Sequence, residues 1–312
     1  MAAIPSCPAA LPKLARLGLS ALGEDGPIDS WLGFTSFDPG CSEELLSLGD
    51  DVNTGSLSSL ESHARLNRRM VNCRHEHTPT AAEWHTLLPW LMDGAVAGAG
   101  TAASAYTYAL GGTLSRRFAA WHDTQTFWDL YAVGIDSATI SASQSDPAVR
   151  LSSDWIGHDW DNTGTFPSGL VPPTDAPFIF SDSDGAVLVN GVARRCESVS
   201  ITIAKNVAGD RFHNSKTIAC AVSQSRQVTV SLTGPWGLNS GMLELGRSSS
   251  VPVVVTFTFG PRVLTFTMPR VRQPPRAPGA SVPAEILHTW TGVALASASL
   301  NDEMSASLKL TA

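Results

Sequence analysis

The stretch DSATISASQSDPAVRLSSDWIG, residues 136–157, contains an acidic residue, an alternating segment, a short polar turn and a second alternating segment. In the first segment, small apolar residues alternate with the hydroxyl residues Ser137, Thr139 and Ser141. Alternation with period two predicts a β-strand that buries one face and leaves the other in solvent. We therefore expect a tight antiparallel hairpin here, in a protein that is mainly β.

A similar first strand returns further along the chain. The segment ESVSITIA (197–204) has the same acidic first residue and the same alternation as DSATISAS (136–143). This match aligns Asp136 with Glu197 and gives a second set of hydroxyl positions, which are Ser198, Ser200 and Thr202. The two segments are predicted to be equivalent strands.

The second strand of the hairpin also has a counterpart. VSLTGPWG (230–237) matches VRLSSDWIG (149–157), which aligns Trp236 with Trp155. Residues 205–226, KNVAGDRFHNSKTIACAVSQSR, separate the later pair of strands and are long enough for an extended hairpin. The match predicts two copies of one β-sandwich-like unit in tandem, and chance similarity between short strands is the alternative.

The bulk composition narrows the class of protein. The chain has 312 residues, 43% hydrophobic and 16% charged, with a net charge of −7. Its length favours two domains, and no apolar run is long enough to span a membrane. A negative chain is unsuited to gripping nucleic-acid phosphates, which requires basic patches.

The N-terminal residues lack the order of a signal peptide. We expect residues 1–60 to form an N-terminal arm and an irregular region, with a transit peptide as the alternative. Five scattered cysteines indicate reduced, mostly buried thiols and a cytoplasmic setting rather than a disulfide framework.

Local signals divide the remainder. TPTAAEWHTLLPWLMDGA (78–95) predicts a helix with Thr80 as its N-cap, Glu83 as the capping-box partner, and a kink or an end at Pro89. VPVVVTFTFGPRVLTFTMP (251–269) predicts a β-hairpin with a Gly-Pro turn. The predicted domains are 61–165 and 178–312, joined by a Pro/Gly-rich linker at 166–177.

Residue types that often carry chemistry occur without a recognisable site. CRHEH (73–77) places Cys73, His75 and His77 on one strand face, which we expect to be solvated because no fourth zinc ligand is evident. His122, Asp123, His158 and Asp159 accompany no nucleophile motif. We expect no catalytic residue, no cofactor and no metal.

Four stretches give the chain its resemblance to a known family. They are TAAEWHTLLPWLMDGA, YAVGIDSATISASQSDPAVRLSSDWIG, FIFSDSDGAVLVNGVARRCESVSITIAKNVAGDRF, and LTFTMPRVRQ with the closing NDEMSASLKL. In this order, over about residues 70–312, the chain resembles the tail tube (major tail) proteins of long-tailed bacteriophages, in their large two-domain form. The first 60 residues depart most from that family.

The resemblance implies a structural virion protein rather than an enzyme. It implies two tandem tail-tube-like β-sandwich domains, each with a small flanking helix, in rings that stack into a β-barrel tube. Three chains with pseudo-sixfold symmetry, or six chains, would make a ring, and the genome would pass through the channel during ejection. Its partners would be itself, the tape measure, tail tip and terminator proteins, with DNA passing unbound. The expected location is the virion tail, after assembly in the host cytoplasm.

Two sets of residues follow from this resemblance. The residues expected to face the lumen are Asp136, Ser137, Thr139, Ser141, Glu197, Ser198, Ser200 and Thr202. The residues expected to contact other subunits, from the long insertion and the basic stretch 269–279, are Lys205, Asp210, Arg211, Arg270 and Arg272.

Two other functions stay open at this point. A β-sandwich binding or adhesion module of a virion or cell surface would expose an aromatic platform and have no ring-forming sheet edges. A hydrolase in the 110–165 region would bring together His122, Asp123, His158 and Asp159.

Overall fold

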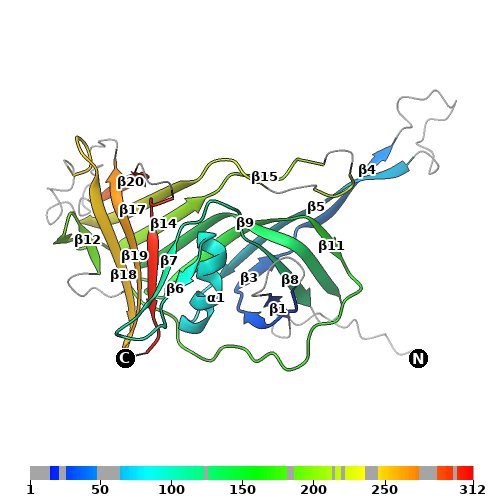
Figure 1. The fold of residues 1–312 in the computed structure, drawn as a ribbon, viewed down its shortest axis with the longest axis horizontal. Helices are drawn as coiled ribbons and strands as arrows, with labels where there is room; N and C mark the ends of the chain where they lie inside the picture. Colours follow the sequence, from blue (N-terminus) through cyan, green and yellow to red (C-terminus); the bar gives the residue numbers. More distant parts are fainter. Residues whose placement is uncertain are drawn as a thin grey trace, which may run out of the picture.

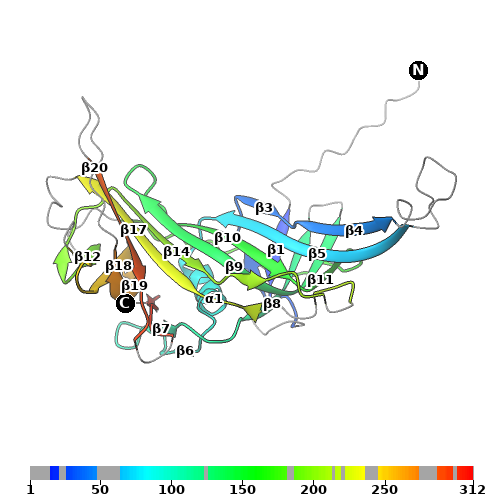
Figure 2. The same ribbon diagram turned by 90° about the horizontal axis from the view of Figure 1, so that it is seen from above.

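The computed structural model describes residues 15–20, 26–47, 64–122, 126–180, 186–212, 215–218, 222–235, 245–273, 287–297 and 301–311. Within those ranges the chain has twenty-one strands and one helix, and all strands except a small two-stranded pair belong to one branched sheet. Figures 1 and 2 show an elongated molecule with the helix near its middle. No helix in the described part is long and apolar enough to cross a membrane.

A central layer of seven strands extends through the molecule. Its order is β4 (Cys41–Ser47), β5 (Ala64–His77), β10 (Arg150–Gly157), β9 (Phe127–Ser143), β14 (Ser198–Ala204), β17 (Gln227–Pro235) and β20 (Leu287–Ala294). Every neighbouring pair is antiparallel. The predicted hairpin is β9–β10, and its counterpart is β14–β17.

The two hairpins meet edge to edge in this layer. β9 pairs with β14 from Ser143↔Ser198 to Ser137↔Ala204, and Ile140 lies directly opposite Ile201. Because these two isoleucines also align in the sequence match, a local two-fold axis normal to the sheet relates the first strands. The second strands do not follow the match. Leu151 pairs with Ile140, but Ile201 pairs with Val230, which is two residues before the matched Leu232. Trp236 lies outside the described residues.

A second layer covers the later half of the central sheet. Its strands run in the order β12 (Val187–Val189), β18 (Val251–Phe259), β19 (Arg262–Arg272), β21 (Ser305–Lys309), β7 (Tyr106–Ala109) and β6 (Val96–Ala97). The predicted hairpin at 251–269 is confirmed, and its turn holds Gly260 at φ 57°. Its inward residues are fully buried except Phe259, which is 39% exposed at the tip.

The earlier half of the central sheet is covered by different strands. β8 (Arg116–His122) pairs with β9, and β1 (Arg16–Leu19) and β2 (Ser30–Leu32) extend it, while β3 (Ser36–Asp38) lies beside β5. The expectation of irregular structure before residue 60 is therefore wrong for the four segments that form β1, β2, β3 and β4. The sequences of these strands show little alternation of apolar and polar residues. They are strands because β1 pairs with β8, and β3 and β4 pair with β5.

The helix α1 (Ala81–Met92) lies between the layers. Thr80 and Glu83 form the predicted capping box, and Trp84, Leu87, Leu88 and Leu91 are buried as expected. The helix does not stop at Pro89 but continues to Met92. No second helix occurs in the described part of residues 178–312, so the expected flanking helix of that half is not seen there.

Two long connections link the halves. Residues 162–178 form no helix and no named strand and cross the lower side of the molecule in Figure 1; that 166–177 is a linker between two domains stays a prediction. We call the segment 205–226 the arm; its described residues, 205–212, 215–218 and 222–226, lie along the top of Figure 1 between the centre and the β4–β5 pair. β15 (Val207–Ala208) and β16 (Val222–Ser223) pair with each other at its base. The remaining small strands are β11 (Asp159–Asp161) and β13 (Val192–Ala193).

The CRHEH strand face is buried, not solvated as the sequence suggested. Cys73, His75 and His77 are 2%, 0% and 4% exposed, because this face of β5 packs against Trp155 and Phe37. The described residues contain no group of three metal-ligating side chains. The histidines are therefore core residues.

The neutral state of His75 can be tested by pH. Its Nε2 lies 2.8 Å from the carbonyl oxygen of Gly33, so Nε2–H donates, and burial lowers the pKa of His75 to about 4. Between pH 6.5 and about pH 4 the unfolded chain thus binds more protons than the folded chain, and within this window acid should lower the unfolding free energy by up to about 1.4 kcal/mol per pH unit. We expect the NMR ring signals of His75 to titrate near pH 4. Titration near pH 6.5 would contradict this burial.

Candidate assembly surface

A continuous hydroxyl face covers four central strands. Alternate residues of β9, β14, β17 and β20 point away from the core and are half-buried or exposed. From residue 137 of β9 onward, and in β14, β17 and β20, none of these alternate positions carries a charge. The face consists mainly of Ser137, Thr139, Ser141, Ser143, Ser198, Ser200, Thr202, Thr229, Ser231, Thr233, Thr289 and Thr291.

The hydroxyl groups pair across the strands. Thr139 and Thr202 are 3.1 Å apart, Ser231 and Thr291 are 3.1 Å apart, and Thr233 and Thr289 are 3.0 Å apart. Such cross-strand pairs stabilise the register of the sheet. They also leave fewer hydroxyl groups available for hydrogen bonds to other molecules. The result is a polar surface without fixed charge.

The face becomes charged toward β10 and β5, but its arginines are paired locally. Arg150 is 2.6 Å from the carboxylate of Asp146, and Arg74 is 3.0 Å from Glu76. Asp154 accepts a hydrogen bond of 2.8 Å from Ser137. Each arginine of this zone therefore has an acidic neighbour on the same surface.

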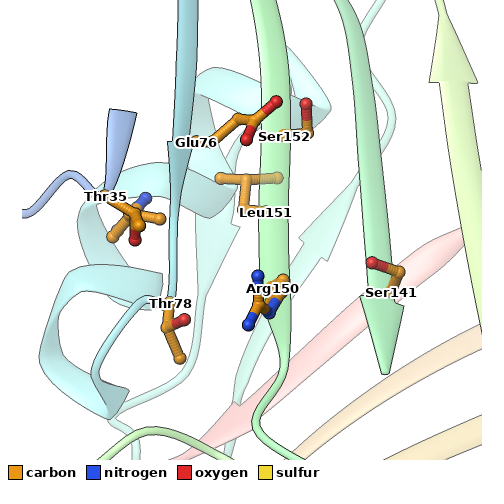
Figure 3. Close-up of a pocket in the computed structure, with 8 residues that line it drawn as sticks. Thr35, Glu76, Thr78, Ser141, Arg150, Leu151 and Ser152 are labelled. Atoms are coloured by element: carbon orange, nitrogen blue, oxygen red, sulfur yellow. The ribbon is translucent and has the colours of Figure 1, made fainter. Parts of the chain in front are cut away.

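Two shallow hollows adjoin Arg150. The first, of about 190 Å³, is lined by Thr35, Glu76, Thr78, Ser141, Arg150 and Ser152 among others, and Figure 3 shows Arg150 between Thr78 and Ser141. The second, of about 240 Å³, continues across β9 to Ser198 and Ser200. Both are lined chiefly by hydroxyl and ion-paired side chains, and neither contains a nucleophile with an adjacent base.

The structure brings the six predicted hydroxyl residues onto one surface. Ser137, Thr139 and Ser141 lie opposite Ala204, Thr202 and Ser200, and Ser198 completes the set opposite Ser143. Glu197 lies just before β14. Whether this surface lines a channel stays a prediction.

Asp136 has a different local role. The β9–β10 register skips it, because Ser137 pairs with Asp154 while Ile135 pairs with Trp155. At this bulge its carboxylate accepts a hydrogen bond of 2.6 Å from the backbone N–H of Val207. Asp136 thus fixes where the arm leaves the sheet.

The sequence did not single out the hydroxyl residues of β17 and β20. They are Thr229, Ser231, Thr233, Thr289 and Thr291. The signal was available in the alternation of QVTVSLT and LHTWTG, but nothing local indicated that β20 would lie beside β17.

The predicted contact residues have different environments. Asp210 is exposed and Arg211 half-buried on the arm. Arg270 pairs with Asp302, and Arg272 donates to the carbonyl oxygen of Ser248 at 3.1 Å. Lys205 is fully buried in its own chain, so it is not among the contacts that we propose.

The His and Asp residues do not form one site. His122 lies on β8 beside Phe127 and Phe166, whereas His158 contacts the carbonyl oxygen of Ile218 on the arm. Asp159 pairs with Arg69. Asp123 lies outside the described residues.

The described part of the chain therefore defines a mainly β protein whose central sheet ends in the edge strands β4 and β20. A family model described as phage tail tube protein matches residues 76–286, which is more than half of the 312 residues. The chain belongs to the phage tail tube protein family. It is therefore a structural component of a phage tail, with a non-enzymatic role. No curated protein matches the chain.

Lys205 forms a buried ion pair at the root of the arm. Its Nζ lies 2.8 Å from Asp93, whose side chain is 5% exposed, and 3.3 Å from the carbonyl oxygen of Trp90 at the end of α1. Burial lowers the pKa of Lys205 and raises that of Asp93, while their mutual attraction opposes both shifts. The pair holds the arm against the helix.

Replacing Asp93 by Asn should leave the Lys205 ammonium buried without a counter-charge. We expect the unfolding free energy, measured by urea titration, to fall by roughly 3 kcal/mol. Adding Lys205→Met should restore part of that loss because no charge then remains buried. A loss below about 1 kcal/mol for Asp93→Asn would contradict the role of this pair.

Proposed function

We propose that the chain polymerises as stacked rings into the tail tube, and that the hydroxyl face lines the channel through which the genome is ejected. The observation that carries the proposal is this hydroxyl face, which is continuous and uncharged from residue 137 of β9 across β14, β17 and β20. Duplex DNA carries about one negative charge per 1.7 Å of its axis. A wall of unpaired arginines would hold it, whereas hydroxyl groups and locally paired charges let it pass.

The sheet edges support self-assembly. In the part of the chain that is described, β4 pairs only with β5, and β20 pairs with β17 and, at Val293 and Ala294, with β19. Edge strands tend to recruit further strands, and closure of a sheet into a barrel removes its edges. The seven central strands alternate in direction, so β4 and β20 run the same way. A direct seam between copies rotated about the tube axis would therefore be parallel.

The choice between three and six chains depends on which units are equivalent. The aligned strands β9 and β14 run antiparallel, whereas rotation about a tube axis preserves strand direction. That match therefore gives no support to pseudo-sixfold symmetry. The β4–β5 and β14–β17 hairpins lie four strands apart, run the same way, and each carries a long connection, at 48–63 and 205–226. This second correspondence supports a ring of three chains with two pseudo-equivalent units each.

The remaining partners follow from the same role. We propose two contacts with other copies: the part of the arm that holds the exposed Asp210 and the half-buried Arg211, and the region of Arg270 and Arg272. A tube of this kind would also meet the tape measure, tail tip and terminator proteins, and would be assembled in the host cytoplasm. DNA would pass without specific binding.

Cysteine labelling of assembled tubes tests the orientation of the face. We expect Ser231→Cys to react with a small maleimide but not with a protein-linked maleimide once tubes have formed. The matched control is Thr265→Cys on the outer face of β19, which should react with both reagents. Peptide mass spectrometry separates these sites from the native cysteines. Equal reaction of Ser231→Cys with the bulky reagent in tubes and in dispersed chains would contradict the proposal.

Microscopy tests the assembly itself. Negative-stain images of the concentrated protein should show long hollow polymers, and class averages along the axis should show three or six chains. Small particles of one size at high concentration would contradict the tube.

A further inference from the structure

One arginine joins three segments that are distant in sequence. The β4–β5 pair, which we call the ribbon, projects from the central sheet in Figures 1 and 2, and Arg69 lies on its inner part. A two-stranded ribbon on its own is marginally stable in water. Something must therefore fix its direction relative to the body.

The guanidinium of Arg69 binds the ribbon to β11. Its Nη2 donates to the carbonyl oxygen of Trp160 at 2.6 Å, and its Nη1 is 3.0 Å from Asp159. The guanidinium carbon also lies 4.5 Å from the Trp160 ring centre, and Nε is 3.2 Å from Glu43 of β4. β11 is paired with β9, so these contacts reach the central sheet.

The backbone of the same residue binds the arm. The N–H of Arg69 donates to the carbonyl oxygen of Lys216 at 2.7 Å. Beside it, the guanidinium of Arg68 lies 4.9 Å from the Phe212 ring, and Phe212 is 8% exposed. Further along the arm, the carbonyl oxygen of Ile218 contacts His158, which directly precedes β11, and Ile218 is 1% exposed.

Only arginine suits this position. A planar fork can donate to two acceptors and stack on an indole at once, whereas a lysine ammonium is a single flexible charge. The Arg69 side chain is 23% exposed, so its contacts are screened less than those of a surface pair.

We propose that Arg69 is a positioning residue that clasps the ribbon and the arm into one rigid projection, and that ring assembly requires this clasp. The inference rests on the proposed tube function, because it names the residue that prepares two of its contact segments. Preorganisation lowers the ordering cost of association, so loosening the projection should weaken assembly without unfolding the body.

The experiment compares Arg69→Ala, Arg69→Lys and Asp159→Asn with Arg262→Ala, which removes a single ion pair to Asp175 at similar exposure. Hydrogen exchange of the full chain should be at least about tenfold faster at 64–70 and 215–218 in Arg69→Ala, the effect of losing about 1.4 kcal/mol of local stability. In Arg69→Lys, exchange in these segments should be slower than in Arg69→Ala but still faster than in the native chain. In Arg262→Ala it should match the native chain.

Assembly supplies the second measurement. The concentration needed for polymer formation, followed by light scattering, should rise by at least about tenfold for Arg69→Ala and less for Asp159→Asn. The melting temperature of the dispersed body should stay close to the native value. Unchanged exchange in Arg69→Ala would overturn the clasp, and faster exchange with native assembly would overturn its role in assembly. Failure of the native chain to polymerise would contradict the tube function, while the exchange data would still decide the clasp.

Discussion

The structure depends on the antiparallel pairing of β9 with β14. This seam joins the earlier and later halves of the chain into one sheet, with Ile140 and Ile201 opposite each other on the buried side. Because side chains alternate along both strands, the same register that buries these isoleucines brings two rows of hydroxyl groups together on the other side. A shift of one residue would expose the apolar row and bury the hydroxyl row. Core and candidate channel surface are thus two consequences of one register.

The arm and the buried ion pair at its root show a second constraint. Asp136 at the β9 bulge, and Lys205 with Asp93, direct the arm away from the hydroxyl face and across the earlier half of the chain. There the arm meets the ribbon at Arg69. Charged residues in this protein are few, and those at the arm root and the ribbon join segments distant in the sequence. Beside the hydroxyl face, the arginines of β10 and β5 are each paired with an acidic residue, and they lie at one end of the sheet surface.

Much of the secondary structure could be predicted from local pattern. The capping box at Thr80 and Glu83, the burial of the alternating apolar residues in β9, and the β18–β19 hairpin were confirmed. The strands before residue 48 were missed: β1, β2 and β3, of three or four residues, carry too little periodicity to be recognised without their partners, and the sequence of β4, CSEELLS, does not alternate. The strand at CRHEH was expected, but the prediction that its face is solvated was wrong. Its polar residue types suggested solvent, whereas in the structure aromatic residues from distant strands cover this face.

The sequence by itself determined which residues alternate, where the helix begins, and that the chain carries a net negative charge, since these depend on neighbouring residues or on composition. Within each strand the hydroxyl residues share a face because side chains alternate along a strand; that this face lines a lumen stays a prediction. Tertiary structure alone decided that the two rows are adjacent, that β17 and β20 enlarge them, and that Lys205 is interior. An alternating strand requires a partner and a cover, but nothing local specifies which strand or which layer will supply them.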